Sequence, residues 1–66
     1  MGYNYKVGDK VFIKSTPTTA ILGLDYKVGK VIQVEPDMVK VKIISKEQKD
    51  KEYWLLLTEI ELYKSA

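Results

Sequence analysis

The chain of 66 residues contains no cysteine, no histidine and no arginine. Without cysteine it has neither disulfide bridges nor a thiol nucleophile. Without histidine it lacks the side chain that serves most often as a general base and a metal ligand. Its basic residues are all lysines. Lysine holds a phosphate as a point charge but lacks the planar fork with which arginine recognises phosphate and guanine, so sequence-specific reading of bases is disfavoured.

Few of the remaining groups suggest catalysis or cofactor binding. The glycines are scattered, so the chain has no glycine-rich phosphate loop. Asp9 precedes a strand and is expected to form a turn, while Glu59 and Glu61 lie around a turn and are expected to be solvated. Carboxylates in such places do not indicate an acid–base pair or a metal site. We therefore expect no enzyme activity, no metal and no cofactor, and we infer no small-molecule substrate.

Long hydrophobic runs are also missing. No apolar stretch approaches the ~20 residues that cross a bilayer, and the opening MGYNYKVGDK lacks the apolar core of a signal peptide. These features and the absent cysteine favour a cytoplasmic protein. The length and the 45% hydrophobic content fit a single folded domain over residues 1–66. A domain this small buries only about 60% of the surface of its unfolded chain, so association would stabilise it.

The apolar residues follow the two-residue period of β-strands. Alternation is clearest around Val11 and Ile13 and again around Val39 and Val41, and Gly29 marks a bend or a close backbone approach. We expect short strands within residues 7–15, 26–35, 38–44, 52–57 and 60–63.

The connections between these strands carry turn-forming residues. Pro36 and Asp37 predict a turn, and TEIE, residues 58–61, predicts a single helical turn. SKEQKDKE, residues 45–52, is expected to be a solvated hairpin loop, with a mobile contact loop as the alternative. The fold class is therefore all-β, a small five-stranded barrel with a long first loop. A helix over residues 53–63 is the competing interpretation, but it would leave an open sheet edge.

The pattern VGDKVFIKS…GKVIQVEPDMVKVKII…YWLLLTEIELY resembles the Src-homology-3-like small β-barrels. The stretch VGDKV is similar to their opening turn, GKV with the valines that follow is similar to the core of KOW-type barrels, and LTEIEL is similar to their closing turn. The photosystem I stromal barrel subunit and the variable chain of ferredoxin–thioredoxin reductase share this general rhythm. The resemblance implies the barrel fold, on which very different functions occur.

The strand pattern predicts which side chains point into the barrel and which point out. The expected inner face is Val11, Ile13, Val31, Val34, Val39, Val41, Ile43, Tyr53, Leu55, Leu57, Ile60 and Leu62. The expected outward apolar residues are Phe12, Ile32, Ile44, Trp54 and Leu56. A register slip of one residue would instead bury Trp54 and expose Tyr53.

The first loop, STPTTAILGLD at residues 15–25, is hydrophobic in its second half. Ile21, Leu22 and Leu24 either cap the open end of the barrel as extra core or join Trp54 in a docking surface, and the two arrangements can mix. We expect first a non-catalytic protein-interaction module or accessory subunit, whose partner is another copy, a larger complex or a host target of a phage or plasmid product. The expected protein-binding residues are Phe12, Ile21, Leu22, Leu24, Trp54 and Leu56.

The alternative is a lysine-based nucleic-acid-binding barrel of low sequence specificity. Lysines on one side of the barrel would hold phosphates, and exposed aromatic rings would stack on bases. The net charge of only +2 makes such binding weak and dependent on salt. The expected nucleic-acid-binding residues are Lys10, Lys14, Lys27, Lys30, Lys40, Lys42 and Tyr26.

Overall fold

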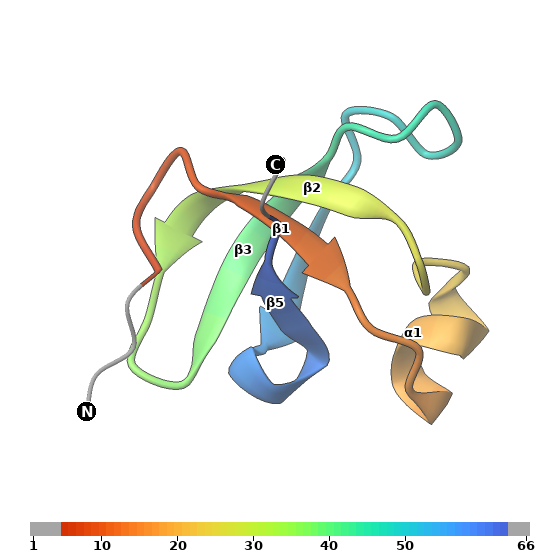
Figure 1. The fold of residues 1–66 in the computed structure, drawn as a ribbon, viewed down its shortest axis with the longest axis horizontal. Helices are drawn as coiled ribbons and strands as arrows, with labels where there is room; N and C mark the ends of the chain where they lie inside the picture. The colour runs from red at the N-terminus through yellow and green to blue at the C-terminus, as the bar shows by residue number, and fades with distance from the viewer. Residues whose placement is uncertain (1–4, 64–66) are drawn as a thin grey trace.

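The computed structural model describes residues 5–63, which form one antiparallel sheet of five strands (Figure 1). The strands are β1 (Lys10–Ile13), β2 (Val28–Val34), β3 (Met38–Ile43), β4 (Glu52–Leu56) and β5 (Ile60–Leu62). Their order in the sheet is β4-β3-β2-β1-β5, so β5 returns to pair with β1. The all-β class is confirmed. Among the described residues β4 and β5 are not paired with each other, so the sheet is open and its closure into a barrel stays a prediction.

The first loop contains a short helix, α1 (Pro17–Leu22), which we did not predict. Thr16 caps its start: the Thr16 hydroxyl accepts from the Thr19 N–H at 3.1 Å, and the Thr19 hydroxyl accepts from the Thr16 N–H at 2.9 Å. Proline at the first helical position adds to this start signal, because it needs no hydrogen-bond acceptor there. Gly23 ends the helix in the left-handed region, with φ of 74°.

The predicted helical turn before the last strand is present as η1 (Leu57–Glu59). It lies between β4 and β5, so residues 53–63 do not form a continuous helix and the competing interpretation is wrong. The turn at Pro36 and Asp37 is also present, and the Glu35 N–H donates to the Met38 carbonyl at 2.8 Å across it.

The hydrophobic core lies on the inner face of the sheet and includes one residue of the first loop. Its buried members are Val11, Ile13, Leu24, Val31, Val39, Val41, Ile43, Leu55 and Ile60, with Tyr5, Tyr53 and Leu57 packed against them. The prediction was wrong for Val34 and Leu62, which are 40% and 42% exposed. Each is the last residue of its strand, and the ladder of β2 with β3 shifts register between Val31 and Gln33. These two side chains therefore lie at the rim of the core, although Val39 and Val11 opposite them are buried.

Gly29 marks the close backbone approach that the sequence indicated. It pairs with Ile43 on β3 and is buried. A Cβ atom at this position would collide with the side chain of Val41 and would come 3.0 Å from the Lys42 carbonyl oxygen. The inner face can therefore pack tightly here only because residue 29 has no side chain.

Tyr5 closes one side of the core next to β5. Its hydroxyl donates to the Ile60 carbonyl at 3.4 Å. Burial raises the pKa of Tyr5 above its ordinary value of 10.0, and the carboxylates of Glu61 and Asp9 raise it further. Asp9 itself forms the expected turn, since its side chain accepts from the Lys6 N–H at 2.9 Å.

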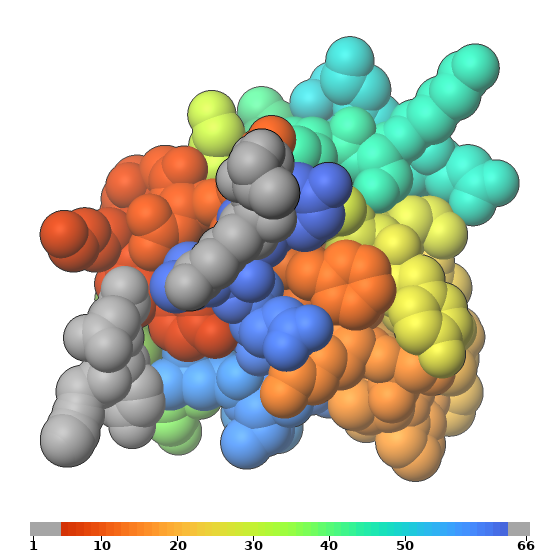
Figure 2. All heavy atoms as spheres, viewed as in Figure 1, coloured from red at the N-terminus to blue at the C-terminus, as the bar shows by residue number. Residues whose placement is uncertain are grey.

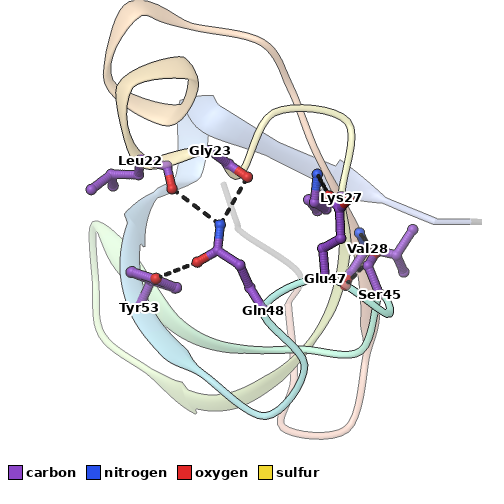
Figure 3. Close-up of polar contacts among 8 residues, drawn as sticks. All are labelled: Leu22, Gly23, Lys27, Val28, Ser45, Glu47, Gln48 and Tyr53. Atoms are coloured by element: carbon purple, nitrogen blue, oxygen red, sulfur yellow. Dashed lines mark hydrogen bonds and ion pairs between the residues drawn. The ribbon is translucent and has the colours of Figure 1, made fainter.

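The loop between β3 and β4 holds the end of α1 against the sheet (Figure 3). The Gln48 amide donates to the Leu22 and Gly23 carbonyls at 3.2 and 3.0 Å, and its oxygen accepts from the Tyr53 hydroxyl at 2.6 Å. Lys27 forms an ion pair with Glu47 at 3.2 Å in the same region. The predicted hairpin loop is thus correctly placed, but one of its side chains is a structural link.

Candidate binding surfaces

Three lysines, Lys10, Lys30 and Lys42, form a straight row across the outer face of the sheet. Lys10 lies opposite Lys30 in the β1–β2 ladder, and Lys30 lies opposite Lys42 in the β2–β3 ladder. Side chains of directly opposite residues share one face, and the neighbouring Val11 and Val31 point into the core. The three side chains of this lysine row therefore point outward, on strands about 4.8 Å apart.

An aromatic residue and an acidic residue lie at the two ends of the lysine row. Tyr63 follows β5, its N–H donates to the Lys10 carbonyl at 2.9 Å, and the Lys10 ammonium lies 5.5 Å from the centre of its ring. Glu52 lies opposite Lys42 on β4, but it forms its ion pair with Lys40 at 3.4 Å.

The ion pairs within residues 5–63 involve Lys27 and Lys40, so no carboxylate of this part of the chain pairs with the lysine row. Glu61 also faces outward, but it lies opposite Phe12 in the ladder of β1 with β5. The row is therefore a local concentration of positive charge on an otherwise weakly charged protein.

Hydrophobic side chains form a second surface, which borders the first along β3 and β4. Trp54 lies opposite Lys40, and Leu56 lies opposite Met38. Trp54 is 41% exposed and Leu56 is 46% exposed, whereas Leu55 between them is buried. We call Met38, Trp54 and Leu56 the apolar edge. Its position confirms the predicted outward register of Trp54 and Leu56 and excludes the slip that would bury the indole.

A shallow hollow adjoins the apolar edge at the turn between β2 and β3. It is lined by Pro36, Asp37, Leu56, Leu57 and Thr58. The apolar edge is thus not flat but continues into a recess beside η1.

The backbone of β4 is open to a further strand. Hydrogen-bonded pairs alternate with non-bonded pairs in an antiparallel ladder. The Ile43 N–H donates to the Lys51 carbonyl at 2.8 Å, so by this alternation Tyr53 is bonded to β3 and Trp54 is not. The amide and carbonyl of Trp54, like those of Glu52, therefore point away from β3 toward the free edge.

Glu59 closes only one end of this edge. Its carboxylate accepts from the Leu56 N–H at 3.0 Å and from the Thr16 hydroxyl at 3.4 Å. Glu59 is 7% exposed, so the expectation of a solvated carboxylate was wrong. Burial of this side chain is explained by its two partners, the end of β4 and the start of α1, which lie far apart in the sequence.

The residues of the first loop divide between the core and the surface. Ile21 is 85% exposed and Leu22 is 42% exposed, while Leu24 is completely buried. Leu24 is therefore a core residue, and its assignment to a protein-binding surface is corrected. The fold-back of the chain after α1 explains the burial, because the Leu24 N–H donates to the Thr19 carbonyl at 2.8 Å.

Ile21 and Leu22 belong to α1 rather than to the apolar edge, so the exposed residues expected to bind protein come from separate elements. Phe12 is half-buried on β1, and its ring lies 6.3 Å from that of Tyr26 in a tilted pair. Tyr26 is 68% exposed. Figure 2 shows β1, β5 and α1 next to one another on one face, while the 45–51 loop projects at a corner.

The lysines expected to bind nucleic acid are only partly brought together. Lys10, Lys30 and Lys42 form the row, and Lys40 faces the same side. Lys27 is paired with Glu47 beside α1, and Lys14 follows β1 outside the ladder. Tyr63, and not the expected Tyr26, is the aromatic residue next to the row, because β5 pairs with β1.

Among residues 5–63, no three acidic, histidine or cysteine side chains are grouped so that they would hold a metal ion. Neither helix in that range is long and apolar enough to span a bilayer.

No known family model matches the chain, and neither the characterised proteins nor the solved structures compared with it show significant similarity.

Proposed function

We propose that the protein is a non-catalytic interaction module that docks a protein partner, or a second copy of itself, through the apolar edge. The observation that carries this proposal is the exposure of Trp54 and Leu56 side by side on the end strand of the sheet, at 41% and 46%. Tryptophan is a frequent anchor of protein interfaces because it offers a large rigid surface with one polar atom. Met38 beside Leu56 extends the same surface with a flexible apolar side chain.

The open backbone of β4 supports a particular way of docking. An extended segment of a partner can pair with the free amide and carbonyl groups of Glu52 and Trp54, and its side chains can contact the indole. Exposed strand edges attract such pairing unless the fold protects them. Within residues 5–63, a side chain covers the Leu56 amide alone on this edge, and that side chain is Glu59.

A Src-homology-3-like barrel shape that leaves the edge of β4 unpaired belongs to the same proposal. Support comes from a core drawn from all five strands and from η1, which leads the chain from β4 at one end of the sheet to β5 at the other. A core this small leaves little stability in reserve, so binding at the apolar edge would also stabilise the fold.

The test compares Trp54→Ala with Ile21→Ala, which removes an even more exposed apolar side chain, 85% against 41%, from α1. Light scattering over a concentration series measures self-association, and a pull-down from the source cell measures partner capture. We expect Trp54→Ala to lose the association and Ile21→Ala to keep it. The proposal is wrong if the wild type is monomeric at every concentration and captures nothing that the Trp54→Ala variant does not.

A further inference from the structure

The lysine row is not explained by the proposed docking surface. Like charges directly opposite each other on neighbouring strands destabilise a sheet. Lys30 has such a neighbour on both sides, Lys10 on β1 and Lys42 on β3. Within residues 5–63 no ion pair relieves this repulsion. Glu52 lies opposite Lys42 at the end of the row but is ion-paired with Lys40, and Lys30 has no acidic residue opposite it. This arrangement weakens the fold at Lys30 and indicates an anionic ligand.

The residues around the row indicate what kind of anion it is. The Lys10 ammonium lies 5.5 Å from the Tyr63 ring centre, and the Lys40 ammonium lies 5.9 Å from that of Trp54. Both rings are partly exposed, at 43% and 41%. Lys40 is ion-paired with Glu52, and Trp54 belongs to the apolar edge. The Lys10–Tyr63 pair therefore presents the available positive charge next to a flat aromatic surface, which suits a phosphate followed by a base.

We propose that the outer face of β1, β2 and β3 binds single-stranded nucleic acid through the lysine row, with Tyr63 stacking on a base. Lys10, Lys30 and Lys42 lie on neighbouring strands, so the row spans about 10 Å and faces consecutive phosphates of one strand. This function is additional to protein docking and uses different residues.

Single-stranded nucleic acid is favoured over a duplex by the shape of the face. Duplex readers insert a helix or a two-stranded ribbon into a groove. The lysine row instead lies on β1, β2 and β3 and not on α1 or within the 45–51 loop, and Figure 1 shows that these strands form the body of the sheet. A single strand can lie along the sheet and turn its unstacked bases toward Tyr63. Without arginine there is no bidentate reading of guanine, so the binding is expected to tolerate most sequences.

The salt dependence of binding follows from the number of phosphates that are neutralised. For a single strand, each phosphate contributes about −0.7 to the slope of log K against log salt. Occupancy of the row by three phosphates gives a slope of about −2, which is about a twentyfold loss of affinity between roughly 50 and 200 mM salt. A slope of log K against log salt smaller in magnitude than this would mean that fewer lysines contact the nucleic acid.

The experiment measures the fluorescence anisotropy of labelled oligothymidine at these two salt concentrations. Lys30→Ala removes the centre of the row, and Lys49→Ala removes the same charge from an exposed position in the 45–51 loop. We expect Lys30→Ala to bind several times more weakly, with a slope smaller by about 0.7. Lys49→Ala should bind within about twofold of the wild type. Circular dichroism confirms that each variant is folded.

Tyr63 is tested by the pair Tyr63→Leu and Tyr63→Phe. Loss of stacking should weaken the binding of Tyr63→Leu about fivefold or more, while Tyr63→Phe keeps the ring and the affinity. The proposal is overturned by absence of binding at low salt, or by equal losses in Lys30→Ala and Lys49→Ala. It is also overturned if a duplex of the same length, or polyglutamate, binds as tightly as oligothymidine. Because Lys30 and Tyr63 lie outside the apolar edge, this result and the Trp54 result can fail independently.

Discussion

Replacing Lys30 by glutamate should stabilise the fold, although a charge reversal on a surface is usually close to neutral. Lys30 lies between Lys10 and Lys42, each directly opposite it in a ladder. Glutamate there converts two repulsive pairs into two attractive ones. Lysine and glutamate are similarly poor strand formers, so the backbone preference changes little.

The expected gain can be worked out from the separation of the charges. Two unit charges about 6 Å apart in water interact by about 0.7 kcal/mol, and salt near 0.1 M lowers this to about 0.4 kcal/mol. Removing two repulsions and adding two attractions of this size gives about 1.5 kcal/mol, within the usual range for cross-strand pairs. In a domain of this size, that corresponds to a rise in Tm of roughly 6–12 °C.

Thermal unfolding followed by circular dichroism, at roughly 0.1 M and 1 M salt, measures this gain. At 1 M salt the screening length falls to about 3 Å, so most of the gain should disappear. The control is Lys49→Glu, in the exposed 45–51 loop. The reasoning is refuted if Lys30→Glu gives no gain, if its gain persists at 1 M salt, or if Lys49→Glu gives the same gain.

The same substitution should remove binding of single-stranded nucleic acid. Lys30→Glu would then be more stable and less active, which is the usual sign of residues kept for function at the expense of stability. This opposite pair of effects separates a ligand site from a merely solvated row of lysines.

Three further predictions concern the parts of the fold that hold the surfaces in place. Leu24→Ala should lower the free energy of unfolding by about 2–5 kcal/mol because its side chain is fully buried, whereas Ile21→Ala should change it by less than about 0.5 kcal/mol. Urea unfolding measures both changes, and equal effects would contradict the placement of the first loop. Glu59→Ala should lower the free energy of unfolding by about 1–3 kcal/mol because it leaves the Leu56 N–H without its acceptor, and Glu59→Gln should lower it less because one side-chain oxygen remains. A Glu59→Gln variant as unstable as Glu59→Ala would contradict this role. Burial raises the pKa of Tyr5 in the folded state, so the hydroxyl loses its proton at lower pH in the unfolded chain, and stability should fall as the pH rises above about 10. Unfolding curves between roughly pH 9 and 11 should show a smaller fall for Tyr5→Phe than for the wild type, and an identical fall would contradict this role of Tyr5.

The two-residue period of the sequence predicted most of the inner face, because a strand in a small sheet has one enclosed side. Val11, Val31, Val39 and Val41 are buried as the alternation required, and Trp54 is exposed for the same reason. The pattern failed at the ends of β2 and β5, where Val34 and Leu62 continue the alternation but are exposed.

Other features depend on contacts between distant parts of the chain, which no local pattern encodes. Leu24 is buried because α1 folds back onto the sheet, and Gln48 holds that helix from 25 residues away. Helix α1 itself has a cap made by two threonines rather than the usual threonine and glutamate, and it is only six residues long. The lysine row requires the register of three strands, since the sequence shows which lysines face outward but not which lie opposite each other.

Quenching of the fluorescence of Trp54 by acrylamide tests the central claim most directly, because the chain has a single tryptophan. The account requires the indole to lie on the outer face of β4, 41% exposed and available to a partner. At low protein concentration we expect emission close to that of tryptophan in water. Quenching should then reach a substantial fraction of that measured for the urea-unfolded chain. A blue-shifted emission that acrylamide hardly quenches would place the indole inside the core and contradict the orientation of the sheet on which both surfaces depend.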